Sequence, residues 1–274
     1  MKNENNAVTL ILLIVLAITF LFPFIYMIGG SFKSNEEALT SPDKLFPSQF
    51  HWENFIQVFQ VINLPRQTVN SCVMAFTVTF GQITVSALGG YAFARIKFFG
   101  RDVLFVIFLA TLIVPFELLF VPLYIMLARW GWINTYWALI VPSLGNPFAI
   151  FIFRQFFLTV PKELEEASSI DGAGYLHTFF ALMLPLSGPA VASVFILTWL
   201  AEWSTLLKPL LFTTSKTMYT LQVGLNFLNR GAQVTTPTIA WLLAGITLAS
   251  LPAIVMFLVL QRRFVESIAQ TGLK

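Results

Sequence analysis

The sequence has little charge, one cysteine and two histidines, and these scarcities exclude several classes of protein. Only 11% of its 274 residues are Asp, Glu, Lys or Arg, whereas a soluble globular domain carries about 25%. A soluble enzyme, a disordered chain, a fibrous repeat and a nucleic-acid binder are therefore excluded. Cys72 is the single cysteine, and His51 and His177 lie 126 positions apart, so we expect no disulfide, no metal site and no cofactor in this chain.

Apolar residues take the place of the missing charge. They make up 57% of the sequence, and the mean hydropathy is +0.79. The net charge of +3 comes from 16 basic and 13 acidic residues, so no basic tract is available for a nucleic-acid partner. The class of protein that fits is an integral membrane protein, which has membrane lipid as a partner.

Six stretches are long and apolar enough to cross a bilayer, whose core of about 30 Å requires roughly 20 apolar residues in a helix. Five of these stretches contain no Asp, Glu, Lys or Arg: residues 5–32, 67–94, 130–153, 172–201 and 231–261. The sixth, residues 103–128, contains a single acid, Glu117. The predicted spans are residues 8–30, 69–93, 104–128, 134–155, 178–202 and 240–261.

We expect these spans to be helices, because lipid offers the backbone no hydrogen-bond partner and a barrel would show alternating segments of about 10 residues. Prolines remove helix hydrogen bonds, and we interpret those within the spans as kinks: Pro23, Pro115, Pro122, Pro142, Pro185 and Pro252. The sequence predicts an all-α integral membrane protein with one transmembrane domain over residues 1–274.

The distribution of Lys and Arg predicts that both termini are cytoplasmic. With that orientation, the inside segments hold nine Lys and Arg in roughly 50 residues and the outside segments seven in roughly 80. The short loop from Arg95 to Arg101 carries three of the inside cations. A cleaved signal peptide is the alternative for the first span, but its apolar run exceeds 20 residues and no A-x-A-like site comes after it.

One predicted cytoplasmic loop, residues 159–177, has the pattern of a short helix, a break and the entry to the next span. Three acids come after Pro161 in the first two turns, where a helix dipole favours negative charge. Leu164, Ala167 and Ile170 form one apolar stripe. Asp171 is placed to cap the next helix, and Gly172 to allow a tight turn. The loop suits a protein groove, although an ordinary solvated connector has the same composition.

The same loop carries a family resemblance. Glu166-Ala167-Ser168, three residues, Gly172, nine residues and Leu182-Met183-Leu184-Pro185 resembles the E-A-A-x3-G-x9-I-x-L-P loop of ABC importer permeases. Ser168 in place of the second Ala and Leu182 in place of Ile are small departures. The similarity extends along nearly the whole chain, for example in Gly90-Tyr91-Ala92-Phe93-Ala94-Arg95 and Tyr219-Thr220-Leu221-Gln222-Val223-Gly224-Leu225, and it is greatest to the sugar-importer, maltose-type branch.

The resemblance implies a type I ABC importer transmembrane domain with a cytoplasmic coupling helix, in a bacterial or archaeal inner membrane. It implies a second, different permease subunit, two ATP-binding subunits that hold ATP and Mg, and an extracellular or periplasmic sugar-binding protein. The chain lacks G-x-x-x-x-G-K-[ST] and is not itself an enzyme. The ATPase-coupling residues would be Glu165, Glu166, Ala167, Ser168, Ile170, Asp171 and Gly172.

The remaining candidates belong to a substrate pathway for a sugar, expected to be a di- or oligosaccharide. Glu117 is the one carboxylate deep in a predicted span, where burial costs about 2.5–3.5 kcal/mol. Its carboxylate faces either the pathway or a neighbouring helix with which it forms a structural bond. Trp199 and Trp203 serve either as interface anchors or as stacking surfaces for sugar rings, beside Ser204, and Asn226 lies in the polar outer loop 204–239.

The alternative function is an ion-gradient-driven secondary transporter. Such a protein is expected to have inverted internal repeats and several intramembrane carboxylates, whereas this sequence has one such carboxylate and no fixed-period repeat.

Overall fold

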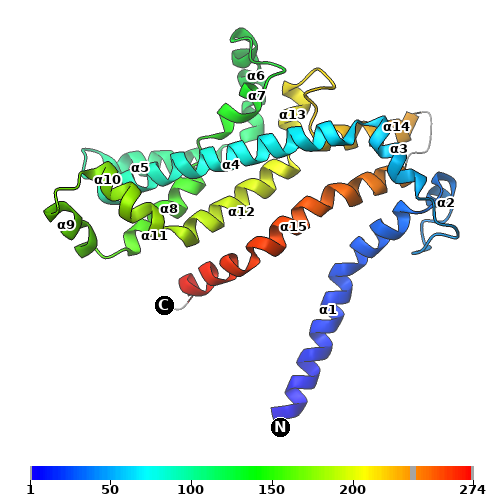
Figure 1. The fold of residues 1–274 in the computed structure, drawn as a ribbon, viewed down its shortest axis with the longest axis horizontal. Helices are drawn as coiled ribbons and strands as arrows, with labels where there is room; N and C mark the ends of the chain where they lie inside the picture. Colours follow the sequence, from blue (N-terminus) through cyan, green and yellow to red (C-terminus); the bar gives the residue numbers. More distant parts are fainter. Residues whose placement is uncertain (1, 235–238, 273–274) are drawn as a thin grey trace. The chain divides into compact units, whose positions relative to one another are not determined.

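The computed structural model describes residues 2–234 and 239–272, with side chains over residues 9–229 and 239–261. Every regular element in this part of the chain is a helix (Figure 1). The chain divides into two compact units, residues 1–68 with 221–252 and residues 69–220 with 253–274.

The six apolar stretches of the sequence all appear as helical segments, three of them as single helices of membrane-spanning length. Three are continuous: Thr9–Ser31 within α1 (Lys2–Ser31), α4 (Leu64–Arg95), and Ile239–Gln261 within α15 (Ile239–Gly272). Three others are bent pairs, Arg101–Ile113 with Phe116–Arg129, Tyr136–Ser143 with Pro147–Thr159, and Tyr175–Leu186 with Gly188–Ser204. Each pair overlaps one predicted span, so the described chain has up to six spans.

The bent pairs are broken more sharply than the kinks that the prolines predicted. The angles between their halves are 87°, 43° and 75°. Pro115 lies at the first break, Pro142 next to the second and Pro185 just before the third. The elements involved are α5 (Arg101–Ala110), η1 (Thr111–Ile113), η2 (Phe116–Leu119), α6 (Phe120–Arg129), α7 (Tyr136–Ile140), η3 (Val141–Ser143), α8 (Pro147–Thr159), α10 (Tyr175–Thr178), η4 (Phe179–Met183), α11 (Leu184–Leu186) and α12 (Gly188–Ser204).

Two of the prolines do not interrupt their helices, and a kink at either one stays a prediction. Pro23 lies inside α1 and Pro252 inside α15, and both helices continue through them. Neighbouring backbone adjustments in a long helix can re-satisfy the carbonyl that proline leaves free. The π-helical turn η4 precedes Pro185, and such wide turns commonly accompany an interrupted hydrogen-bond ladder.

The first unit includes the segment between the first and second predicted spans, residues 31–68, which folds into ordered structure. It contains α2 (Asn35–Thr40), α3 (Glu53–Val61) and α14 (Leu221–Val234) besides parts of the long helices. Buried Asn54 donates to the carbonyls of Ser31 and Lys33 at 2.9 and 2.8 Å. The buried ammonium of Lys33 donates to the carbonyls of Ser41 and Lys44. These bonds satisfy backbone groups that a loop would otherwise leave unpaired.

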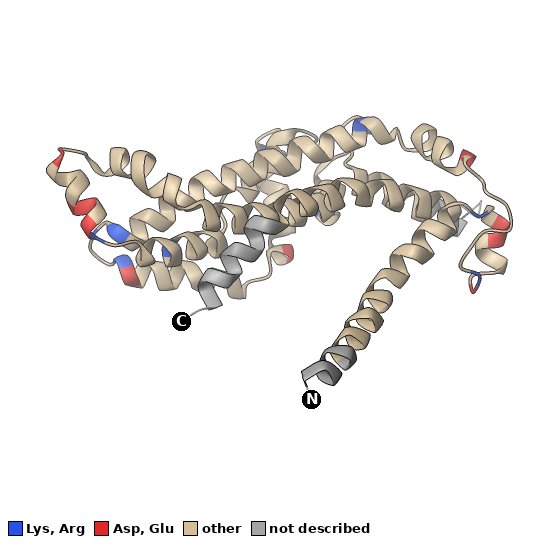
Figure 2. Ribbon diagram, turned by 60° about the horizontal axis from the view of Figure 1, so that its bottom comes forward, with Lys and Arg blue, Asp and Glu red and all other residues tan. Residues whose placement is uncertain are grey.

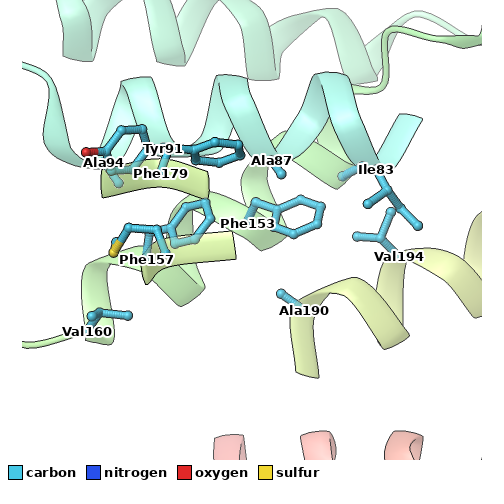
Figure 3. Packing of buried hydrophobic residues seen from close by; sticks show 12 residues of the cluster. Ile83, Ala87, Tyr91, Ala94, Phe153, Phe157, Val160, Phe179, Ala190 and Val194 are labelled. Atoms are coloured by element: carbon cyan, nitrogen blue, oxygen red, sulfur yellow. The ribbon is translucent and has the colours of Figure 1, made fainter. Parts of the chain in front are cut away.

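An aromatic cluster forms the core of the second unit near the ends of α4 and α8. The ring of Tyr91 on α4 lies 5.9 Å from that of Phe157 on α8 and 5.4 Å from that of Phe179. Phe153 stacks on Phe157 at 6.0 Å. Figure 3 shows these rings facing one another between the helices, with Ala87 beside them. This packing joins the ends of α4, α8 and the start of the fifth span.

A close helix approach at Gly90 gives the first testable prediction. A Cβ on Gly90 would lie 2.5 Å from Phe153 Cβ and 2.8 Å from the backbone nitrogen of Arg154, whereas one on Gly89 would meet only the Ile150 side chain, at 3.2 Å. We expect Gly90→Ala to lower the free energy of unfolding by about 1–3 kcal/mol, because the helices must move apart.

Gly89→Ala is the matched control. The Cδ1 of Ile150 is the end of a flexible side chain, and alanine is favoured over glycine within a helix by about 0.5–1 kcal/mol. This variant should therefore keep the thermal unfolding midpoint of the purified protein in detergent or raise it slightly. An equal fall of the unfolding midpoint in Gly90→Ala and Gly89→Ala would show that α4 and α8 do not meet at Gly90.

Candidate functional site

The 159–177 loop folds as its sequence predicted, into a short helix and a turn. The helix α9 covers Glu163–Ile170, with three acids in its first turn. Gly172 has φ +82°, a left-handed conformation that costs an L side chain about 1–2 kcal/mol. The amides of Gly172 and Ala173 donate to the carbonyls of Ser169 and Ser168 at 3.1 and 3.0 Å, which closes the end of the helix.

The expected capping role of Asp171 is wrong. Asp171 is the C-terminal cap residue of α9, and Gly174 occupies the N-cap position of α10 with no side-chain cap. The turn at Gly172 occupies the three residues after Asp171, so Asp171 does not reach the N-cap position of α10. The carboxylate of Asp171 is exposed instead, as is that of Glu166.

The solvent-exposed face of this segment carries apolar side chains that nothing in the described chain covers. Ile170 is 86% exposed, Leu164 is 42% exposed and Ala167 is also exposed. Tyr175 and Leu176, in the first turn of α10, are 64% and 68% exposed. Figure 1 places α9 at one end of the second unit, beyond α10, and Figure 2 shows the acidic residues of α9 near basic residues at neighbouring helix ends. An apolar stripe flanked by acids is suited to bind a protein groove.

Arg95 connects this segment to two spans, a role that the sequence analysis missed. Its guanidinium, 6% exposed, lies 3.0 Å from Glu165 Oε1. It also donates to the Phe157 carbonyl, from Nε at 3.1 Å and from Nη2 at 2.5 Å, and to the Val160 carbonyl. Burial raises the pKa of Glu165, and the charges of Arg95 and Lys162 oppose that rise. The position of Arg95 at the end of the Gly90–Arg95 motif was the available signal.

Ser168 adds a second contact between α9 and the rest of the unit. Its hydroxyl lies 3.0 Å from that of Thr178, at the end of α10. An alanine at this position, the residue of the E-A-A pattern, cannot form this bond. Ser168, which departs from the pattern, therefore has a hydrogen-bond partner in the same chain, Thr178.

A cavity of about 310 Å³ lies elsewhere in the second unit, between α4, α8 and α12. Its polar wall consists of neutral side chains and one carboxylate: Gln82, Asn146, Thr198 and Glu202. Its apolar wall is formed by Phe148, Ala149, Ile152, Val194, Leu197 and Ala201. A few convergent polar groups on an apolar surface are typical of a site for a small molecule.

Gln82 organises the polar wall. Its Nε2 donates to the Ser143 carbonyl at 2.6 Å, and its Oε1 accepts from the Thr198 hydroxyl at 2.8 Å and from Asn146 Nδ2 at 3.3 Å. The Oδ1 of Asn146 in turn caps α8 by accepting from the amides of Phe148 and Ala149. The side chains are therefore fixed by hydrogen bonds to three different spans.

An ion pair closes one end of this wall. Glu202 Oε2 lies 2.5 Å from Lys208 Nζ. The Lys208 ammonium also donates to Ser143 Oγ at 2.7 Å. The two side chains are 12% and 4% exposed, so the charges compensate each other away from bulk water. Lys208 belongs to α13 (Leu207–Phe212), outside the span that ends in α12.

Comparison with known families decides what kind of protein this is. The family model for the binding-protein-dependent transport system inner membrane component matches residues 83–270. The chain belongs to this family. It is therefore an integral, multi-pass inner membrane permease, and ATP hydrolysis resides on partner ATPase subunits. The family membership decides against the ion-gradient alternative.

The relatives of the permease are similar over almost its whole length. The arabinooligosaccharides transport system permease protein AraQ of Halalkalibacterium halodurans is 34% identical, over 100% of both chains. The sn-glycerol-3-phosphate transport system permease protein UgpE of Yersinia pestis is 31% identical over 95% of each chain. The probable ABC transporter permease protein YurM of Bacillus subtilis is 30% identical over 99% of this chain and 89% of its own.

A solved structure shows the same fold. The permease superposes with a TM-score of 0.82 and 21% identity on a chain from the crystal structure of a bacterial ABC transporter involved in the import of the acidic polysaccharide alginate. The match covers 96% of the permease and 97% of that chain. The predicted fold class, a type I ABC importer transmembrane domain built of helices, is confirmed.

The residues predicted for the substrate pathway are dispersed over the permease. Glu117 is exposed in η2 at the 87° break of the third span, and no described side chain pairs with its carboxylate. Trp199 and Trp203 are each 3% exposed and stack at 5.3 Å, so neither ring has a free face. Ser204 is exposed at the end of α12, and Asn226 lies in α14 of the other unit, with a buried Oδ1 that accepts no hydrogen bond from any residue that the structure describes.

The permease has no metal centre among the residues whose side chains are described, since no group of three or more His, Cys, Asp and Glu is placed to hold an ion. The cavity residues Gln82, Asn146 and Thr198 were missed by sequence reasoning. They are neutral polar residues inside apolar runs, and nothing in the sequence alone shows that they converge.

Proposed function

We propose that the permease forms half of the translocation pathway for a neutral di- or oligosaccharide. A second, different permease subunit would supply the other half, and two ATP-binding subunits would bind on the cytoplasmic side. An extracellular or periplasmic sugar-binding protein would deliver the substrate. The observation that carries the choice of substrate is the chemistry of the cavity wall.

Among the described residues, the wall offers hydrogen bonds and one carboxylate but no free cation. A sugar phosphate or a uronate requires Lys or Arg to compensate its charge. The Lys208 ammonium, which contacts the wall at Glu202, is already paired with that carboxylate. Hydroxyl groups, in contrast, match the amides of Gln82 and Asn146 and the hydroxyl of Thr198. The substrate named for AraQ is of this neutral kind, whereas those named for UgpE and for the alginate transporter carry negative charge.

The coupling part of the proposal concerns α9 and its turn. Glu165, Glu166 and Asp171 would lie at the rim of a groove on the ATPase, and Ala167 and Ile170 would occupy its apolar floor. Ser168 would hold α9 to α10, and Gly172 would set the direction of the helix. The exposure of Ile170 supports this docking face. Both termini would then be cytoplasmic, in agreement with the cation-rich loop 95–101.

We also propose that the pathway includes the residues that the sequence predicted for it: Glu117, Trp199, Trp203, Ser204 and Asn226. The position of Glu117 supports it most, because an exposed carboxylate at a helix break in a span needs either water or a partner subunit beside it.

The substrate class can be tested by measuring the ATPase activity of the permease purified with its partner subunits and binding protein. Neutral oligosaccharides should stimulate hydrolysis, and glycerol 3-phosphate and oligouronates should not. Ala201→Phe, which fills the cavity, should remove uptake, while Ala201→Ser should keep it. Stimulation by an anionic solute alone, or normal uptake by Ala201→Phe, would contradict the assignment.

A further inference from the structure

We propose that Arg95 is a positioning residue that fastens the coupling helix α9 to the second and fourth spans, so that a displacement of α9 moves α4 and α8 directly. This inference rests on the proposed coupling function of α9. It adds a route of transmission separate from the chain connection between α9 and the fifth span.

The contacts of Arg95 join three elements. Its backbone ends α4, its guanidinium binds the carbonyls of Phe157 and Val160 at the end of α8, and its charge lies 3.0 Å from Glu165 on α9. The last carbonyls of a helix have no amide donor four residues on. The Phe157 carbonyl accepts from the Val160 amide as well as from Arg95, and the Val160 carbonyl accepts from Arg95. The planar guanidinium can serve several acceptors at once, which the ammonium of lysine does less well.

The body to which Arg95 fastens α9 is rigid. At Gly90 the two helices approach so closely that a Cβ would lie 2.5 Å from Phe153 Cβ. The rings of Tyr91, Phe153 and Phe157 pack beside that crossing, as Figure 3 shows. Close-packed interiors transmit displacement because they have little free volume to absorb it. A shift of the Arg95 guanidinium would therefore be carried into both helices.

The covalent route from α9 to the fifth span is less rigid. It passes through Gly172 with φ +82° and two further residues before α10 begins. One side-chain hydrogen bond, between Ser168 and Thr178, crosses this turn. A glycine turn with one side-chain hydrogen bond across it can change its angle. The Arg95 guanidinium contacts α9 through its ion pair with Glu165, and it is itself fixed by hydrogen bonds to two carbonyls at the end of α8. We infer that the side-chain route carries a substantial part of the movement.

Arg154 offers a matched control, since it is a half-buried arginine at the same end of the unit. Its Nε donates to the Phe93 carbonyl at 3.3 Å, and its guanidinium lies over the Phe105 ring and 3.7 Å from Asp102. It links α4, α8 and α5, but it makes no described contact with α9. Loss of either arginine removes a cross-link between spans, and only loss of Arg95 releases the coupling helix.

The experiment compares Arg95→Gln, Arg95→Lys, Glu165→Gln and Arg154→Gln in the full complex reconstituted in liposomes. Amounts of complex, basal ATPase, ATPase stimulated by the loaded binding protein, and solute taken up per ATP are measured. For Arg95→Gln we expect unchanged co-purification with the ATPase and a loss of uptake per ATP of about fivefold or more, as for a typical coupling between sites. Arg95→Lys should recover part of the lost uptake per ATP, and Arg154→Gln should keep the wild-type uptake per ATP.

The double variant Arg95→Gln/Glu165→Gln separates the ion pair between Arg95 and Glu165 from other roles of Glu165. If the two residues act as one connection, the double variant should be no worse than Arg95→Gln. Additive losses, or equal uptake per ATP in Arg95→Gln and wild type, would overturn the inference. A wild-type permease that never co-purifies with an ATPase would instead refute the proposed function, independently of any Arg95 variant.

Discussion

Transport is expected to stop when Gly172 is replaced by aspartate, while insertion into the membrane stays normal. The native φ of +82° is strained for any residue with a Cβ, by about 1–2 kcal/mol. The new carboxylate would also lie beside Asp171 at the C-terminal end of α9, where the helix dipole disfavours negative charge. Both effects reorient or fray the end of the coupling helix, so we expect loss of co-purification with the ATPase and loss of uptake.

Two controls separate backbone strain from added charge. Gly174 has an ordinary φ of −80° and, like Gly172, open space around a Cβ, so Gly174→Asp adds the same charge without the strain. Asparagine tolerates the left-handed region better than most residues, and Gly172→Asn should therefore keep much of the activity. Normal uptake and normal co-purification in Gly172→Asp would show that this turn does not set the ATPase contact.

Removal of Lys208 is expected to give the largest loss of stability. The Lys208→Met variant leaves the Glu202 carboxylate buried without its cation, and breaking a buried pair by removing one partner costs about 3–5 kcal/mol. Ser143 Oγ also loses its donor. The thermal unfolding midpoint of the purified permease in detergent should fall markedly.

The double variant Lys208→Met/Glu202→Gln should recover most of the loss, because it removes both charges together. Lys216→Met is the matched control, since Lys216 is an exposed lysine of the same outer segment, and it should unfold at the wild-type temperature. Equal midpoints for Lys208→Met and Lys216→Met would mean that the pair is not buried in the membrane-embedded protein.

Much of the fold was predictable because the strongest signals in the sequence are long and local. A run such as Thr9–Ser31 has one stable form in lipid, and its length fixes its role. Gly172 was also predictable, since a glycine after an eight-residue amphipathic segment is a common helix end. The sharp breaks at residues 114–115 and 187 were not, because a proline or serine can be accommodated by a kink or by a break, depending on the neighbouring helices.

The site was predictable only in its local part. The acids and the apolar stripe of α9 lie within eight residues, whereas Arg95 reaches its partners across 62 to 70 positions. The Gln82 bonds span 61 to 116 positions. A single sequence contains no information on which polar residues of different spans meet. The two tryptophans were similarly ambiguous, because a ring at the end of a span can point outward or pack inward, as Trp199 and Trp203 do.

The central claim is that this permease supplies a pathway and a coupling helix, while other subunits hydrolyse ATP. The most direct test is uptake of a neutral oligosaccharide into liposomes that contain either the permease with its co-purified partners or the permease alone. We predict uptake only by the complex, and only with ATP on the ATPase side and binding protein on the other. Uptake by the isolated permease without nucleotide would contradict that claim.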